Sequence, residues 1–136
     1  MTELAIGEVT ARTGLSVHAL RFYEKEGLLV APVRRDANDR RVYTEHDVEW
    51  LLNCTKFRAS GMPLATIREF AALVRQGPGN EEKRLELLRD HQNSVRDRIA
   101  ELADCLDLIS RKVESYEEHV ARGTANELWG QPSRST

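Results

Sequence analysis

Residues 12–43 read RTGLSVHALRFYEKEGLLVAPVRRDANDRRVY, and the fold can be inferred from this segment. Gly14 supplies a turn, and Ser16 is placed to cap a short helix that ends at Gly27. An arginine-rich hairpin follows and closes on Tyr43. A helix, a glycine turn, a second helix and a basic ribbon are typical of a winged helix-turn-helix, which presents one helix to a DNA groove. The segment therefore predicts a DNA-binding module.

The net charge of the chain is only −2, but the charge is unevenly distributed. Residues 12–43 carry seven basic and four acidic side chains, whereas residues 77–136 carry nine basic and twelve acidic ones. Phosphate binding depends on charge at the contact face, because exposed charges further apart than about 10 Å are screened by salt. The small overall charge therefore does not exclude a nucleic-acid partner.

With 136 residues, the chain has room for one small domain and an appendage. No apolar run approaches the roughly 20 residues that span a bilayer, and the N-terminus lacks a signal-peptide pattern. We therefore expect a cytoplasmic protein without a membrane partner. Its two cysteines, Cys54 and Cys105, share no short spacing, so reduced thiols are expected rather than a disulfide framework.

The apolar pattern before Gly27 predicts two short helices, the first of which stops at Gly14. In the second helix, the residues expected to face the core are Val17, Leu20 and Phe22. The opposite face would carry His18, Arg21 and Lys25. Beyond this helix, residues 28–30 and 41–43 are expected to pair as two short strands, with residues 36–39 as the loop between them.

Two further helices are predicted before the turn at residues 76–80. Thr44 and Asp47 form a variant capping box, which opens a third helix that stops at Gly61. Pro63 then precedes a fourth helix with one apolar face. The glycine- and proline-rich turn is the clearest boundary in the sequence, so we expect residues 1–76 to form the DNA-binding domain.

A heptad pattern of apolar residues follows the turn and extends for about five and a half repeats. It occupies positions 85, 88, 95, 99, 102, 106, 109, 113, 116 and 120. Gln92 interrupts the series, either as a tolerated substitution or as a residue that fixes the register. A helix over residues 81–121 would be roughly 60 Å long and could not bury this stripe alone. We therefore expect residues 77–121 to form a dimerisation helix and residues 122–136 a tail, in which Leu128 and Trp129 dock locally.

Four separated motifs, followed by the heptad helix, closely resemble the MerR family of bacterial transcription regulators: RFYE at 21–24, GLL at 27–29, RVY at 41–43 and DV at 47–48. The resemblance covers residues 4–121. It implies a mainly α fold, in which a winged helix-turn-helix head with a small β-hairpin wing precedes a long C-terminal antiparallel coiled-coil dimerisation helix.

The resemblance also implies a function. Members of the family are homodimers, here through residues 81–121, that bind a pseudo-palindromic operator in double-stranded promoter DNA. They bend and untwist an over-long promoter spacer so that RNA polymerase holoenzyme can engage both promoter elements. Such action through spacer geometry depends on the deformability of DNA.

The candidate DNA contacts are Ser16, His18, Arg21, Tyr23, Arg34, Arg40, Arg41, Tyr43, Lys56 and Arg58. On the second helix, His18 and Arg21 would reach base edges or flanking phosphates, although a solvated helix face is the alternative. Tyr23 could bind phosphate through its hydroxyl or be a half-buried aromatic residue. Arg41 could instead pair with an acidic residue near the hairpin.

Cys54 leaves two interpretations open. It could be a small buried hydrophobic residue, or a thiol whose pKa is lowered by Lys56 or Arg58 and which electrophiles modify. The chain is similar to the branch of the family that answers to aldehydes and to nitrosative or oxidative electrophiles, and this resemblance favours effector sensing by Cys54. Cys105, beside the heptad stripe, is expected to serve in packing.

Other classes of function are disfavoured by the sequence. No histidine lies within one helical turn of either cysteine and no phosphate loop is present, so we expect neither an enzyme nor a cofactor. The regions that hold paired cysteines in metal-sensing relatives contain none here, so no metal site is expected, although Cys54, His91 and His119 could share one. The alternatives are a regulator of this type with an unidentified small ligand or metal, and an architectural DNA-binding protein without an effector.

Overall fold

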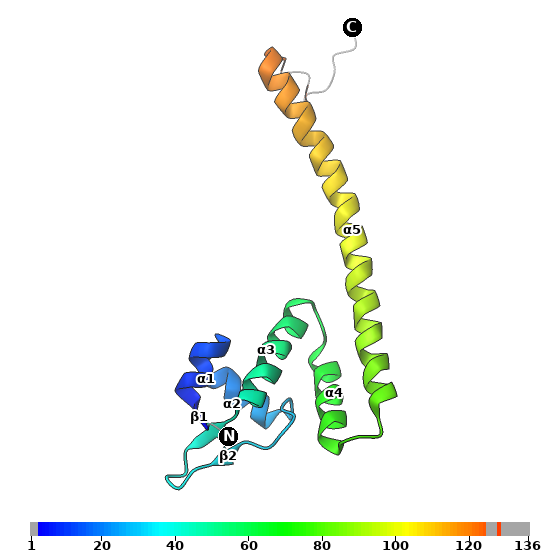
Figure 1. Cartoon of the computed structure of the whole chain (residues 1–136). Coiled ribbons are helices and arrows are strands. Elements are labelled where there is room, and N and C mark those ends of the chain that lie inside the picture. The colour runs from blue at the N-terminus through cyan, green and yellow to red at the C-terminus, as the bar shows by residue number, and fades with distance from the viewer. Residues whose placement is uncertain (1–2, 125–127, 129–136) are drawn as a thin grey trace. The chain divides into compact units, whose positions relative to one another are not determined.

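The computed structural model describes residues 3–124 and residue 128 (Figure 1). Within the described residues the elements run β1 (Leu4–Ala5), α1 (Ile6–Thr13), α2 (Val17–Lys25), β2 (Arg34–Arg35), β3 (Arg41–Tyr43), α3 (Glu45–Ala59), α4 (Leu64–Gln76) and α5 (Glu81–Arg122). The chain divides after Gln92 into two compact units. A mainly α fold with a helix-turn-helix head, a small sheet and a long C-terminal helix is therefore confirmed.

The turn between α1 and α2 forms as its residues predict. Gly14 adopts a left-handed backbone conformation with φ of 75°, and its N–H donates to the Thr10 carbonyl. The Ser16 hydroxyl oxygen accepts a hydrogen bond from the Ala19 N–H at 3.0 Å, so it satisfies one of the free donors at the start of α2. The two helices are thereby fixed at the turn expected from the sequence.

The sheet formed by the described residues has three strands, whereas the sequence predicts two. β3 is central and pairs antiparallel with β1 on one side and β2 on the other. The expectation that residues 28–30 pair with residues 41–43 is wrong, because Leu28 and Leu29 are buried in the core. Their apolar side chains pack there, and the place expected for residues 28–30 beside β3 is taken by the arginine pair of β2.

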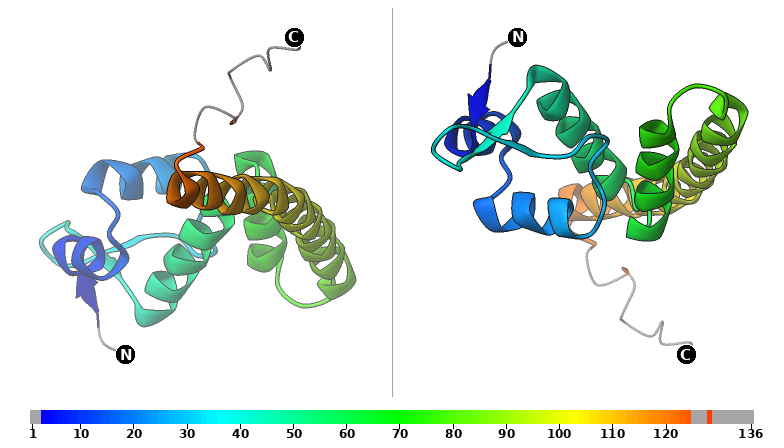
Figure 2. Two further views of the ribbon diagram at one scale, coloured as in Figure 1. Left: turned by 90° about the horizontal axis from the view of Figure 1, so that it is seen from above. Right: turned by 90° about the horizontal axis from the view of Figure 1, so that it is seen from below.

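Helix α3 begins at the capping box that Thr44 and Asp47 predict. The Thr44 hydroxyl accepts from the Asp47 N–H at 3.2 Å, and the Asp47 carboxylate accepts from the Thr44 N–H at 2.9 Å. Helix α3 lies between α4 on one side and the N-terminal helices and sheet on the other (Figure 2). Helix α3 contributes Val48, Trp50, Leu51 and Cys54 to the buried core cluster.

The chain segment after α2 is held by side chains of α3 and α4. Four consecutive carbonyl groups, those of residues 26–29, each accept a side-chain hydrogen bond. Arg68 Nε donates to residue 26 at 2.8 Å, and Trp50 Nε1 donates to residue 28 at 2.8 Å. Arg75 donates to residue 27 at 3.1 Å and also to residue 29. We call this arrangement the carbonyl clamp; it anchors the segment that directly follows α2.

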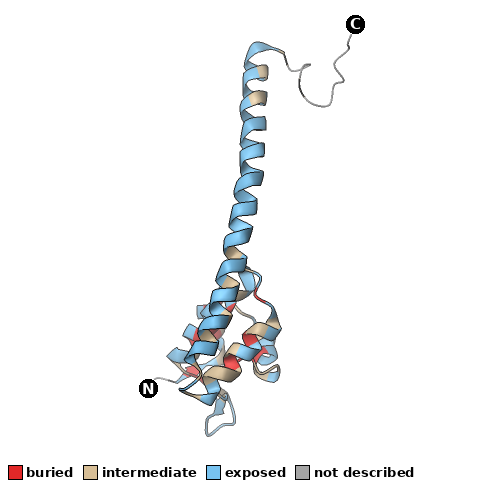
Figure 3. Cartoon of the chain, turned by 90° about the vertical axis from the view of Figure 1, so that its right-hand side faces the viewer, coloured by how far each residue is buried: buried red, intermediate tan, exposed pale blue. Residues whose placement is uncertain are grey.

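Helix α5 agrees with the predicted helix to within one residue, and none of its residues is buried (Figure 3). The heptad positions are exposed to solvent over most of their length, from 37% at Leu88 to 68% at Val120. No helix in the described part of the chain is both long and apolar enough to cross a membrane. The expected docking of Trp129 lies outside the described residues.

Candidate nucleic-acid interface

The outer face of α2 carries the side chains that a recognition helix would present to DNA. Val17, His18, Arg21, Phe22 and Lys25 are all exposed. The two apolar members, Val17 and Phe22, are each 37% exposed. The residues expected to point outward, His18, Arg21 and Lys25, therefore do so. The Ser16 hydroxyl precedes them and is engaged in capping the helix.

A basic cleft of about 400 Å³ lies between α2 and the wing, which we define as residues 34–43. Its lining comprises Ala5, Ile6, Arg21, Arg35, Asp39, Arg40 and Arg41. Four guanidinium groups thus share the lining with a single carboxylate. Guanidinium groups bind phosphate through charge-assisted and often bidentate hydrogen bonds. The cleft is therefore suited to a phosphate of a nucleic-acid backbone.

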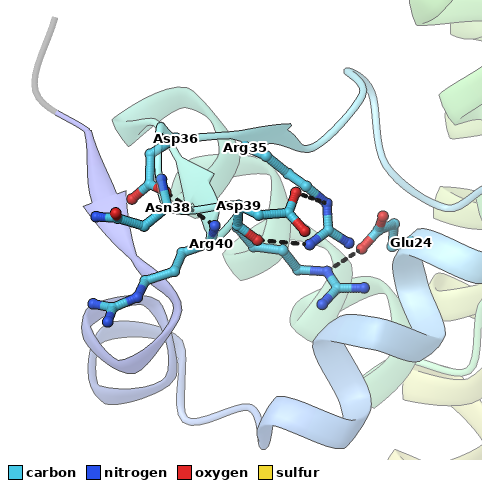
Figure 4. A network of polar contacts seen from close by, with 7 residues as sticks. Glu24, Arg35, Asp36, Asn38, Asp39 and Arg40 are labelled. Carbon is cyan, nitrogen blue, oxygen red and sulfur yellow. Dashed lines mark hydrogen bonds and ion pairs between the residues drawn. The ribbon is translucent and has the colours of Figure 1, made fainter.

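The turn of the wing is built by acidic side chains (Figure 4). Asp36 Oδ1 accepts hydrogen bonds from the backbone N–H groups of Asn38 and Arg40, both at 2.9 Å. Asp39 has a positive φ of 60°, a conformation that aspartate tolerates better than most residues. Arg35 donates to the Asp39 carbonyl at 2.9 Å. These contacts fix the turn, and the Arg40 side chain extends from it without an ion pair to any described residue.

Arg41 is engaged within the protein. Its Nε donates to Glu24 Oε1 of α2 at 2.7 Å, and this hydrogen bond raises the pKa of the guanidinium. The two side chains are 23% and 33% exposed, so the pair is partly shielded from solvent. The structural alternative considered for Arg41 is thus present, with an acidic residue of the recognition helix as the partner. Arg34 is exposed and has only a loose ion pair with Glu3, at 3.9 Å.

The aromatic residues of the predicted site are arranged differently from the expectation. Tyr23 is 5% exposed and Tyr43 is 1% exposed, so both rings belong to the core. The Tyr43 hydroxyl is itself buried, so its predicted contact with phosphate is wrong, whereas contact of the Tyr23 hydroxyl with phosphate stays a prediction. The expectation that Val17 and Phe22 face the core is also wrong, since both side chains are 37% exposed.

Lys56 and Arg58 are exposed in the last turn of α3. They do not line the basic cleft. Arg58 is nevertheless close enough to Tyr23 of α2 for its charge to lower the pKa of the tyrosine hydroxyl. Burial raises that pKa by more. Their contact with phosphate stays a prediction.

Cys54 is fully buried, at 0% exposure, and burial raises the pKa of its thiol to about 12. The expectation that Lys56 or Arg58 lowers this pKa is therefore wrong. Both cations are in solvent, where they are screened, whereas the thiolate would lie in the apolar core. Cys105 of α5 is exposed. No group of three or more potential metal ligands is found within residues 3–124 or with residue 128.

The sequence places Arg35 in the arginine-rich wing beside Arg34, and Arg35 lines the cleft. The carbonyl clamp was not predicted from the sequence. Its one sequence signal is the spacing of seven between Arg68 and Arg75, which places both on one face of α4.

Family models match most of the chain. The model described as "MerR HTH family regulatory protein" matches residues 4–73, and the model described as "MerR, DNA binding" matches residues 48–111. The chain belongs to the MerR family. It is accordingly a DNA-binding transcription regulator of the MerR type, and its relatives are regulators rather than enzymes.

Individual MerR family relatives agree with this assignment. An uncharacterised helix-turn-helix regulator of Haemophilus influenzae is 37% identical over 113 residues, which cover 83% of each chain. The crystal structure titled HiNmlR, a MerR family regulator lacking the sensor domain, bound to promoter DNA, is 33% identical with a TM-score of 0.81. It covers 93% of this chain and 100% of its own. A MerR family regulator of Listeria monocytogenes is 28% identical with a TM-score of 0.83, over 88% of this chain and 90% of its own.

The burial of Cys54 and the exposure of Cys105 in this MerR family protein predict that the two thiols react at different rates. At neutral pH, iodoacetamide should label Cys105 at least about 100-fold faster than Cys54, because only the thiolate reacts and a thiol with a pKa near 12 is almost entirely protonated. Mass spectrometry of the digested native protein would measure both rates. Equal labelling of the two cysteines in the folded protein would contradict the assigned burial; equal labelling in urea is expected.

Proposed function

We propose that the chain acts as a homodimer that binds a pseudo-palindromic operator and bends and untwists an over-long promoter spacer. RNA polymerase holoenzyme would then engage both promoter elements. The observation that carries the proposal is the basic cleft, where Arg21 of the recognition helix and three arginines of the wing face one space. A helix in the major groove with an arginine-rich wing beside it can grip both the bases and the flanking backbone.

The dimer is supported by the apolar stripe of α5. A single helix with this many exposed leucine, isoleucine and valine side chains is not expected to be stable alone in water, because the stripe needs a partner surface. An antiparallel pairing of two such helices would cover both stripes and set two recognition helices at a fixed separation. HiNmlR, a relative whose structure was solved bound to promoter DNA, supports promoter binding by this chain.

Two arginines of the cleft should have different roles in binding. Arg21→Ala should cost about 1–3 kcal/mol on the operator and relax the preference at one base position, because an arginine on the recognition helix can read a guanine edge. Arg40→Ala should weaken operator and random DNA alike, and flatten the salt dependence by about one unit, because it is expected to bind phosphate. Fluorescence anisotropy on both duplexes, over a range of salt, measures these effects.

The contrast between the two duplexes serves as the control. If Arg21→Ala and Arg40→Ala lost the same affinity on operator and on random DNA, the assignment of base and phosphate contacts would be incorrect. If neither substitution changed binding, the cleft would not be the interface.

Substitutions on α5 test the dimer. Leu106→Glu should raise the dimer dissociation constant by about 100-fold or more. It removes from each subunit a leucine that the dimer would bury, and it places a charge between the two helices. Leu108→Glu is the matched control: Leu108 is 53% exposed, close to the 61% of Leu106, but lies off the heptad stripe. Analytical ultracentrifugation should find a dimer for the wild type and for Leu108→Glu, and a largely monomeric protein for Leu106→Glu. A wild-type protein that sediments as a monomer would refute the dimer.

An electrophile-responsive Cys54 remains our proposal for the effector. The raised pKa of its thiol makes reaction with an electrophile slow, and the proposal is supported by packing alone: Cys54 and Tyr23 of α2 belong to the same core cluster. Addition of the sulfur to an aldehyde carbon, with the thiol proton passing to the carbonyl oxygen, would add atoms where the core has no room for them. Overpacked cores rearrange, so an adduct at Cys54 would act directly on the recognition helix.

A promoter-reporter assay tests this response. Cys54→Ala should abolish the change in transcription on treatment with an aldehyde, whereas Cys105→Ala should respond as the wild type does, since Cys105 belongs to the second compact unit and not to the core that contains α2. Quantitative reporter measurements with and without aldehyde give the result. An undiminished response in Cys54→Ala would remove that residue as the sensor and leave the DNA-binding proposal intact.

A further inference from the structure

The hydroxyl group of Tyr43 is a buried polar group that forms no hydrogen bond to any described residue. The side chain is 1% exposed, so bulk water does not reach it. A buried hydroxyl without a partner costs free energy, and phenylalanine would fill the same space without that cost. The position of this hydroxyl beside the recognition helix therefore requires an explanation.

The sheet directs Tyr43 and Arg41 to the same place. They are two residues apart on β3, and side chains alternate along a strand, so both project from one face of the sheet. Glu24 of α2 reaches that face, since its carboxylate accepts from Arg41 Nε at 2.7 Å. After burial, the charge of Glu24 has the largest effect on the pKa of the Tyr43 hydroxyl, and it raises that pKa. One carboxylate thus acts on two donors, of which only Arg41 is bonded to it.

Arg41 also faces the basic cleft with Arg21, Arg35 and Arg40. It lies directly opposite Arg35 in the register of β2 and β3, where like charges repel unless anions are nearby. A phosphate in the cleft would offer Arg41 a second anionic partner. If Arg41 turned toward that phosphate, Glu24 would be left as a partly buried carboxylate without its donor, which is costly. Tyr43 carries the donor that could replace it.

We propose that Tyr43 is a positioning residue for DNA binding: its hydroxyl donates to the Glu24 carboxylate when Arg41 turns from Glu24 to a DNA phosphate. The step involves no proton transfer: the hydrogen bond from Arg41 to Glu24 is replaced by one from Tyr43 to Glu24. The free protein keeps Arg41 on Glu24 and leaves the tyrosine hydroxyl unused, whereas the bound protein satisfies all three groups. This inference rests on the proposed function, because it requires that the cleft receive backbone phosphate.

The test uses the full-length protein, a duplex of random sequence, and a duplex that the wild type selects from a random library. Tyr43→Phe should weaken binding to both duplexes by about tenfold, the effect of losing a hydrogen bond to a charged group. Its thermal unfolding midpoint should be unchanged or higher, because an unpaired hydroxyl has been removed. A residue that serves only the core would not combine weaker DNA binding with undiminished stability.

The control is a double-mutant cycle with Glu24→Ala, which removes the acceptor. In that background Arg41 is already free and Tyr43→Phe should leave affinity unchanged. NMR gives a second readout that does not depend on replacing Tyr43. The chain has three tyrosines, so the ¹³Cζ signal of Tyr43 can be resolved. That signal should shift when random duplex is added to the wild type and should not shift in Glu24→Ala.

The outcomes separate the two proposals. If the wild type fails to bind either duplex, the proposed function itself is refuted. If the wild type binds and Tyr43→Phe binds equally well, or if its loss of affinity persists in the Glu24→Ala background, the exchange is refuted and DNA binding stands. If Tyr43→Phe fails to fold, the wild-type ¹³Cζ signal decides: a shift on DNA addition supports the exchange, and an unmoved signal overturns it.

Discussion

The position of the recognition helix depends on how its C-terminal end is held. The last carbonyl groups of α2, those of Phe22, Tyr23 and Glu24, accept hydrogen bonds from the backbone N–H groups of residues 26–28, but the carbonyl groups of the loop that follows would normally be left to water. Here the carbonyl clamp supplies a protein donor to each carbonyl of residues 26–29, from Trp50, Arg68 and Arg75. A helix of nine residues has little stability of its own, so this fixation and the packing of Leu20 against the core determine where its outer face points.

The interface follows from that placement. With α2 held at one end by the clamp and at the other by the Ser16 cap, Arg21 faces the wing, and Glu24 meets Arg41 of β3. The wing is stiffened in turn by Asp36, whose carboxylate replaces solvent for two backbone donors. The arginines of the cleft are therefore carried by elements that are each anchored, which reduces the conformational entropy lost when DNA binds.

Much of the fold could be predicted because its signals are local. Gly14, Ser16 and the Thr44–Asp47 box determine where helices begin and end, and the heptad spacing determines α5. The strand assigned to residues 28–30 failed because a short apolar run satisfies a strand pattern and a core loop equally well. The choice between them depends on tertiary contacts: Leu28 and Leu29 are buried in the core, and their carbonyl groups accept from Trp50 and Arg75. β1 is two residues long and gives no periodic signal.

The candidate site was predicted in part for a similar reason. Charged side chains such as His18, Arg21 and Arg40 are exposed wherever the backbone is placed correctly, so their type is informative. The choice between Phe22 and Tyr23 is not: adjacent helix positions differ by about 100°, and the position of α2 on the core cluster decides which ring is covered. The Cys54 thiol likewise depends on burial, which outweighs the nearby charges of Lys56 and Arg58.

The carbonyl clamp has a consequence for how the recognition specificity of such a head can change. Every acceptor in it is a main-chain oxygen, and every donor belongs to α3 or α4. The outward residues Val17, His18, Arg21 and Phe22 take no part in it. Their side chains can therefore be replaced together to change the DNA sequence that the helix recognises, while the hydrogen bonds that hold the helix stay intact.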